Sequence, residues 1–262
     1  MFAITLNSIV PMRSESKEQS EMCNQLLFGD LVEIIEEDTN FYRIANTFDN
    51  YQGWVDKKML TPISDAIALA IKEEEHPQIN RPIASCFIES KNENILLSGG
   101  SSLPFYNKKK ESFALGDNTY HIDLSQVNLP LTKIFTGDEL LSVAFMYLNT
   151  PYLWGGRNAL GIDCSGFVQV VLSICGIKFP RDTTQQVNEG SLISFLPEAR
   201  SGDLAFFENT SGNISHVGIL INNNQLIHAS GRVKIESIDA QGIIHETTGK
   251  YTHRLRVIKR IL

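Results

Sequence analysis

The stretch GIDCSGFVQVVLSICG, residues 161–176, predicts a helix that begins directly before a cysteine. From Phe167 onward the apolar residues recur at helical spacing, which gives a face for a core. Asp163 is a suitable N-cap, and Gly176 is a suitable residue just past the C-terminus. Cys164 is therefore expected in the first helical turn, where unpaired N–H groups and the helix dipole favour a thiolate. This position favours a nucleophile over a buried cysteine that serves as a small hydrophobic residue.

The segments that follow this helix have the pattern of short strands, and two of them carry histidines. Three asparagines at 222–224 separate SHVGILI from QLIHAS, which predicts a β-hairpin. With these asparagines as the loop, His228 faces Gly218, and His216 and His228 project from one face as diagonal neighbours about 7–8 Å apart. A loop one residue longer or shorter would turn them to opposite faces. A cysteine peptidase needs a base and a group that holds the base, and this hairpin offers both.

Two other interpretations of these residues stay open. Cys164, His216 and His228 are a possible zinc site, although structural zinc sites use closely spaced ligand pairs, which this sequence lacks. A single histidine on a strand most often has a structural role. That role is assigned to the remaining histidines, which are His76, His121, His245 and His253.

The whole chain of 262 residues predicts an α+β protein with three segments. Residues 1–62 show short strands between turns, which in so short a segment favours a small closed barrel. Residues 63–131 hold a connector, helical at 64–75, and a second β-rich block that we expect to be another small barrel. Residues 132–262 place helices first and antiparallel strands afterwards, as in an α+β domain.

Composition and charge argue against several classes of protein. The chain has 23 basic and 30 acidic residues, a net charge of −7, which disfavours a nucleic-acid partner. No apolar run reaches the roughly 18 residues of a membrane-spanning helix, so no membrane partner is expected. The N-terminus lacks the features of an export signal, so we expect a cytoplasmic protein. A signal missing from this sequence would leave the same pattern. A reducing compartment also fits the wide spacing of the four cysteines, Cys23, Cys86, Cys164 and Cys175.

The motifs YLWGG, GIDCSGFVQ, RDTTQQ, GDLAFF, HVGIL and IHAS, in this order, resemble the NlpC-type family of papain-like cysteine peptidases. Members of that family cut the stem peptides of peptidoglycan. The resemblance covers residues 136–262. It implies that Cys164 is the nucleophile, that His216 is the general base and that His228 orients the base.

The same resemblance implies residues that line the site. Tyr152 matches the tyrosine that helps to stabilise the oxyanion, next to the backbone N–H of Cys164. Trp154 is expected to form a wall of the pocket. The positions expected to contact substrate are Asp163, Ser165, Asp182, Thr183 and Ser215.

Residues 1–62 resemble the bacterial SH3-like domain, whose barrels often accompany cell-wall enzymes. The combination resembles γ-D-glutamyl-L-diamino acid endopeptidases, which act on murein peptides with a free N-terminal L-Ala. Recognition of a free ammonium takes a carboxylate and an aromatic face. Glu21 and Tyr51 match these two roles. The alternative is that Glu21 is an ordinary surface acid and that Tyr51 is a packing residue.

Together these resemblances imply a cysteine peptidase, without metal or organic cofactor, whose partner is a small murein peptide. The bond cut would join γ-D-Glu to L-Lys or meso-diaminopimelate, and the role would be cell-wall recycling. A non-catalytic wall-binding or scaffolding module and an exported hydrolase of intact peptidoglycan are the alternatives. No pattern in the sequence indicates an oligomeric state.

Overall fold

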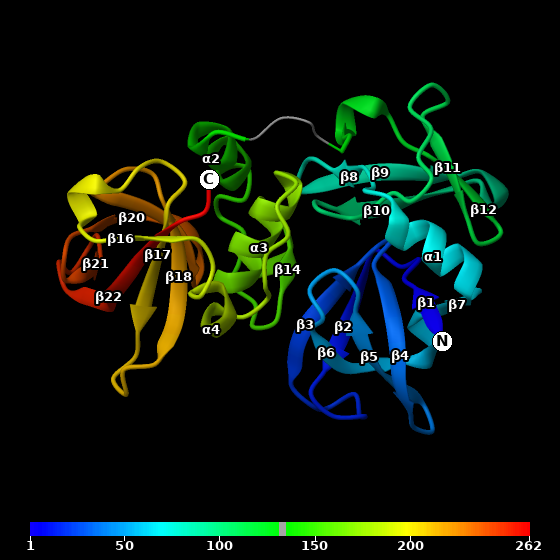
Figure 1. The fold of residues 1–262 in the computed structure, drawn as a ribbon, viewed down its shortest axis with the longest axis horizontal. Coiled ribbons are helices and arrows are strands. Elements are labelled where there is room, and N and C mark those ends of the chain that lie inside the picture. Colours follow the sequence, from blue (N-terminus) through cyan, green and yellow to red (C-terminus); the bar gives the residue numbers. More distant parts are fainter. Residues whose placement is uncertain (131–134) are drawn as a thin grey trace. The chain divides into compact units, whose positions relative to one another are not determined.

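The computed structural model describes residues 1–130 and 135–262, which fall into two compact units, Met1–Thr132 and Lys133–Leu262 (Figure 1). Both units combine helices with antiparallel strands, which confirms the α+β class. The expected boundary between residues 131 and 132 lies outside the described residues. In the described ranges no helix has both the length and the apolar character needed to cross a membrane. Short 3₁₀ helices occur at η1 (Lys57–Met59), η2 (Glu89–Lys91), η3 (Leu124–Gln126) and η4 (Leu196–Glu198).

The N-terminal part of the first unit is a sheet of short strands: β1 (Phe2–Ile4), β2 (Ile9–Arg13), β3 (Met22–Leu27), β4 (Leu31–Glu37), β5 (Phe41–Asn46), β6 (Gln52–Asp56) and β7 (Thr61–Ile63). They pair in the antiparallel order β3-β2-β6-β5-β4-β1-β7. Alternation along β2 turns Val10 and Met12 inward, where they pack with Val32 and Ile44. This sheet therefore has a core of its own.

A helix and a second β block complete the first unit: α1 (Asp65–Glu73), β8 (Gln78–Ile79), β9 (Ile83–Ile88), β10 (Glu93–Ser98), β11 (Ser112–Leu115), β12 (Asn118–His121) and β13 (Val127–Asn128). Four strands form a sheet in the order β10-β9-β12-β11, and β8 pairs with β13. Ser64 caps α1, which buries Ala68 and Ile71. These two residues share a core with Ile4 of β1 and with Phe28, which lies in the turn after β3. The two β blocks thus form one compact unit, and the expected boundary at residue 62 lies inside it.

The second unit begins with helices and a short strand pair: α2 (Gly137–Phe145), β14 (Arg157–Asn158), β15 (Gly161–Ile162), α3 (Cys164–Ile174) and α4 (Thr183–Gln186). A reciprocal cap starts α2. The Glu139 carboxylate accepts the Thr136 N–H at 2.9 Å, and Thr136 Oγ1 accepts the Glu139 N–H at 3.3 Å. Helix α3 is buried along its whole length and packs against α2.

The strands of the second unit are β16 (Ser191–Ile193), β17 (Leu204–Glu208), β18 (Ile214–Leu220), β19 (Gln225–Ser230), β20 (Arg232–Ile238), β21 (Gly242–Ile244) and β22 (Tyr251–Arg260). Their order is β16-β22-β17-β18-β19-β20-β21. Because β22 also pairs with β21, six of these strands close into a barrel. Figure 1 shows α2 and α3 beside this barrel, whose last strand, β22, is drawn in red.

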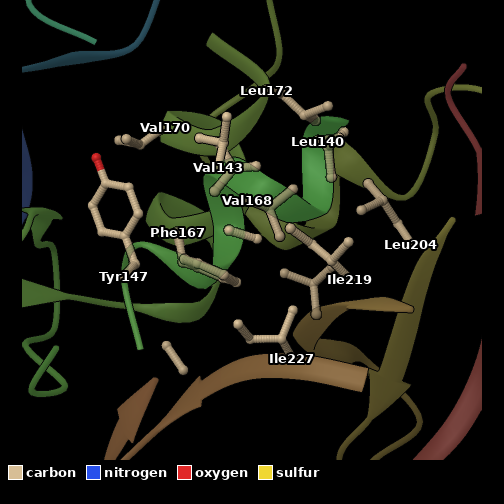
Figure 2. Packing of buried hydrophobic residues seen from close by; sticks show 14 of the residues in the cluster. Leu140, Val143, Tyr147, Phe167, Val168, Val170, Leu172, Leu204, Ile219 and Ile227 are labelled. Carbon is tan, nitrogen blue, oxygen red and sulfur yellow. The ribbon is translucent and has the colours of Figure 1, made fainter. Parts of the chain in front are cut away.

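The main core of the second unit lies between the two helices and the barrel (Figure 2). Leu140 from α2 and Phe167 from α3 pack into one cluster with Ile219 of β18 and Ile227 of β19. Burial of each such side chain contributes about 1.5–3 kcal/mol. This packing fixes α3 against β18 and β19, the elements that carry the candidate nucleophile and the two candidate histidines.

Candidate active site

Cys164 lies in the first turn of α3, as the capping signal predicts. Asp163 is the N-cap, and its Oδ1 accepts the Gly166 N–H at 2.7 Å. Its Oδ2 accepts the Gly155 N–H at 2.8 Å, which ties the preceding loop to the helix start. The backbone around the cysteine is therefore held from both sides.

A buried ion pair stabilises this cap. Arg181, only 1% exposed, donates from Nη1 to Asp163 Oδ1 at 3.0 Å and from Nη2 to Oδ2 at 2.6 Å. Nη1 also lies 2.7 Å from Ser165 Oγ, which in turn donates to Asp163 Oδ1 at 3.3 Å. The side chains of Asp163 and Ser165 thus hold the start of α3, while their predicted contact with substrate stays a prediction.

The predicted register of the β18–β19 hairpin is confirmed, because Ile219 pairs with Ile227. In this register His216 and His228 share a face, and Nε2 of His216 lies 2.8 Å from Nδ1 of His228. Gly218 leaves room for the second imidazole, since a Cβ there would stand 3.0 Å from the Cβ of His228. The two predicted histidines are therefore hydrogen-bonded partners.

A carboxylate that the sequence analysis missed extends this chain of contacts. Glu236 on β20 is 6% exposed, and its Oε2 lies 2.9 Å from Nε2 of His228 and 3.0 Å from Nζ of Lys234. Burial alone would raise the pKa of Glu236, but the hydrogen bonds from His228 and Lys234 lower it to about 2. A charged acceptor therefore faces the second histidine.

Burial determines the protonation state of Cys164, the candidate nucleophile. Burial and the charge of Asp163 raise the pKa of Cys164 to about 12, against the opposing effects of the Val217 N–H and of Arg181. The expected preference for a thiolate is therefore wrong for the resting protein, because desolvation outweighs the N–H groups at the helix start. The Val217 N–H that acts on this sulfur follows His216 directly on β18, so α3 and β18 place thiol and imidazole on neighbouring elements.

The candidate base is also neutral at rest. Burial holds the pKa of His216 well below its usual range, and the nearby His228 and His253 lower it further. The ring of His253 on β22 stacks on that of His216, with centroids 4.2 Å apart and an angle of 26° between the planes. Burial lowers the pKa of His253 itself to about 4. The residue to which the sequence analysis assigned a structural role therefore packs directly on the candidate base.

Tyr152 lies within electrostatic reach of the cysteine. Burial, followed by the charge that Cys164 carries when ionised, raises the pKa of Tyr152 to about 12. The phenol therefore stays protonated and can donate a hydrogen bond. Trp154 is 61% exposed and so lies outside the core, and its role in a pocket wall stays a prediction.

The remaining predicted contacts are more scattered. Asp182 and Thr183 are half-buried at the start of α4, which packs against β18, and Ser215 is exposed on β18 beside the candidate base. Glu21 and Tyr51 belong to the first unit, where Glu21 is exposed and Tyr51 packs against the N-terminal core. The substrate contacts of all five stay predictions. In the described part of the chain no group of three or more His, Cys, Asp or Glu residues is arranged to hold a metal ion.

A cysteine at a helix start, packed on a strand whose histidine is held by a second histidine, defines a papain-like cysteine peptidase. Residues 149–252 match the NlpC/P60 family, and residues 12–60 match the bacterial dipeptidyl-peptidase SH3 domain. The second unit therefore contains a domain of the NlpC/P60 family, and the first unit contains a bacterial dipeptidyl-peptidase SH3 domain. The resemblance drawn from the motifs is thereby confirmed.

Two relatives align with most of the chain. A protein of Bacillus cereus named gamma-D-glutamyl-L-lysine dipeptidyl-peptidase is 25% identical over 86% of this chain and 73% of its own length. Dipeptidyl-peptidase 6 of Lysinibacillus sphaericus is 28% identical over 92% of this chain and 93% of its own. The crystal structure of an NlpC/P60 family protein from Bacillus cereus superposes with a TM-score of 0.85 at 20% identity and covers all of both chains. The fold is therefore shared across both units.

Proposed function

We propose that the protein is a cysteine peptidase that hydrolyses the bond between γ-D-Glu and the diamino acid of small murein peptides with a free N-terminal L-Ala. The observation that carries this proposal is the hydrogen bond between His216 and His228 on the strands beside Cys164. Relatives named gamma-D-glutamyl-L-lysine dipeptidyl-peptidase, which align across most of the chain, support the substrate class.

The acylation step follows from the hydrogen-bond pattern, which leaves Nδ1 of His216 to accept a proton. The thiol proton of Cys164 moves to this nitrogen while the sulfur attacks the γ-carbonyl carbon of D-Glu. The Tyr152 hydroxyl and the backbone N–H of Cys164 are the donors that stabilise the resulting oxyanion. The C–N bond then breaks, and the His216 imidazolium gives its proton to the leaving amine.

Water completes the cycle. The oxygen of a water molecule attacks the thioester carbon while His216 takes a proton from that water, and the C–S bond breaks. The thiolate of Cys164 then recovers the proton. Throughout both steps His228 holds the ring of the base in one orientation.

Selection for a free N-terminus is the proposed role of the first unit. Glu21 supplies a carboxylate and Tyr51 an aromatic face, the two groups that attract an ammonium. Fragments released from the wall carry this free amine, whereas the L-Ala amine of intact murein is blocked by an amide bond. The clamp therefore fits a role in recycling soluble fragments inside the cell.

The decisive experiment compares turnover of L-Ala-γ-D-Glu-L-Lys, its diaminopimelate counterpart and the N-acetylated forms, with products identified by mass spectrometry. We expect cleavage of the free peptides and a loss of at least about tenfold in kcat/KM on acetylation. Cys164→Ser should abolish turnover. Cys175→Ser is the matched control, because Cys175 is also buried at the other end of the same helix.

Two outcomes would overturn parts of this proposal. Equal rates on free and acetylated peptides would remove the amine clamp, and an active Cys164→Ser variant would remove the nucleophile. Release of peptides from insoluble murein would favour an exported hydrolase over recycling. Cell fractionation and the fate of the free tripeptide in a deletion strain test the cytoplasmic role.

A further inference from the structure

Glu236 occupies an unusual position for a carboxylate. Its neighbour His228 is fully buried, and Glu236 itself is only 6% exposed. Strand β20 pairs with β19 so that Lys234 lies directly opposite His228, and Glu236 follows two residues along the same strand. Its Oε2 meets both of these neighbours, at 2.9 Å and 3.0 Å.

The direction of each hydrogen bond follows from the charge on Glu236. An ionised carboxylate only accepts, so Nε2 of His228 carries the hydrogen that it donates. In the neutral ring Nδ1 then has no hydrogen and accepts one from Nε2 of His216, 2.8 Å away. Only Nδ1 of His216 is left to take the thiol proton. A carboxylate two rings away thus determines which nitrogen of the base is available.

We propose that Glu236 is a positioning residue of the peptidase, which fixes the tautomer of His228 and stabilises the imidazolium that His216 becomes during catalysis. This proposal rests on the proposed function. It adds the Glu236 carboxylate to the hydrogen-bonded pair of His216 and His228. The negative charge acts through His228 because the proton taken up by the first ring strengthens both hydrogen bonds in the chain.

Two other ionisable groups lie near the ring of His228. Lys234 shares the carboxylate and is itself partly exposed, and His253 lies 6.0 Å from the His228 ring. Lys234 disfavours a positive charge on both histidines, and His253 disfavours one on His216. Glu236 contacts His228 and is the charge that favours an imidazolium on that ring, in opposition to Lys234.

Two variants separate the two parts of the role. Glu236→Gln keeps an acceptor oxygen for His228 but removes the charge, whereas Glu236→Met removes both. We expect Glu236→Gln to lower kcat about tenfold with little change in KM, and to move the acid limb of the pH–rate profile to lower pH. We expect Glu236→Met to lower kcat about a hundredfold, with Glu236→Asp restoring part of the wild-type rate.

Nuclear magnetic resonance of the imidazole nitrogens gives a readout that needs no substrate. In the wild type and in Glu236→Gln, His228 should show the single tautomer protonated at Nε2, and in Glu236→Met a mixture of tautomers. Glu208→Gln is the matched control, because Glu208 is a largely buried carboxylate of the same barrel that pairs with Arg254 and Arg256. It should leave the tautomer, kcat and the acid limb unchanged.

The proposal fails if Glu236→Gln retains the wild-type kcat and acid limb, or if His228 keeps one tautomer in Glu236→Met. It also fails if Glu208→Gln lowers kcat as much as Glu236→Gln does, because both effects would then follow from lost stability. A wild-type protein that cleaves none of the murein peptides would overturn the proposed function instead. The tautomer of His228 would still decide the role of Glu236.

Discussion

At the scale of single residues, the proposed nucleophile Cys164 and the proposed base His216 are both neutral at rest, and burial is the common cause. Desolvation raises the pKa of Cys164 and lowers that of His216, so each group is held in its uncharged form. In the proposed mechanism the thiol proton therefore moves as the sulfur attacks, whereas in a preformed ion pair it would have moved beforehand. Polar contacts in the transition state then stabilise charges that the resting site disfavours.

One consequence concerns the pH dependence of turnover. The base must be neutral, and its pKa lies well below 6.5, so the acid limb of kcat/KM should also lie below pH 6.5. His253 is one of the groups that lower this pKa, so His253→Asn should move the acid limb to higher pH, toward 6.5. Profiles of kcat/KM from about pH 4 to about pH 8 measure the shift.

The control for this measurement is His245→Asn, since His245 lies in a turn after β21 where it accepts backbone N–H groups of Thr247 and Thr248. It should leave the acid limb in place. An acid limb at or above pH 6.5 in the wild type would contradict the neutral pair.

The site residues that the sequence predicted are marked by their neighbours along the chain, whereas those it missed reach the site from other strands. Cys164 stands at a capped helix start, and the two histidines flank one short loop, so neighbouring residues identify all three. His253 and Glu236 reach the same site from β22 and β20. A signal for Glu236 exists, since a period of two places it on the same inward face as Ile238, but only the pairing of β20 with β19 shows which partner it meets.

At the scale of elements, the β18–β19 hairpin is what brings the histidines together. Its register depends on the turn at residues 222–224, whose polar side chains do not continue a strand. The start of α3 depends in the same way on Asp163, but its partner Arg181 comes from a segment 18 residues away. The hairpin was therefore predictable from its own sequence. For the helix cap the sequence predicted Asp163 but not its partner Arg181.

Gly218 is the point at which this hairpin can be tested. A Cβ at this position would stand 2.7 Å from Cδ1 of Leu226 and 3.0 Å from the Cβ of His228. Gly218→Ala should therefore displace the second imidazole, lower kcat at least about tenfold and cost about 1–3 kcal/mol of unfolding free energy. Turnover and denaturant unfolding of the same preparation measure both effects.

A double variant separates packing from catalysis. Gly218→Ala combined with Leu226→Ala removes the contact with the leucine but not the contact with His228. We expect the double variant to retain the loss in kcat. Full activity in either variant would show that the histidine pair does not need the space that the glycine leaves.

At the scale of the whole molecule, the chain divides into two compact units although the sequence suggests three segments. The reason is the cluster in which Ala68 and Ile71 of α1 pack with Phe28 and with Leu97 of the second β block. Strand patterns identify which residues turn inward, but they do not show which sheet an inward face meets. The SH3 domain and the antiparallel strands of the catalytic unit were predictable from local motifs, whereas the closure of those strands into a barrel and the shared core of the first unit were not.

The two units should also respond differently to acid. In the second unit the pKa of His216 and of His228 lies below 6.5 and that of His253 at about 4, so the unfolded chain binds protons that the folded unit does not. Stability contributed by these groups is present above pH 6.5 and is lost as pH falls toward about 4. In the first unit the carboxyls with a lowered pKa are Asp38, Asp56 and Asp123, and their protonation affects stability only below about pH 3.8.

Each unit contains one tryptophan, Trp54 in the first and Trp154 in the second, so fluorescence can follow them separately. In Trp54→Phe the remaining signal reports the second unit, and in Trp154→Phe it reports the first. Between about pH 7 and about pH 5 we expect the urea midpoint of the second unit to fall while that of the first changes little. His253→Asn should reduce this fall, because one group with a lowered pKa has been removed. Equal shifts of both midpoints would mean that the buried histidines do not control the acid response of the catalytic unit.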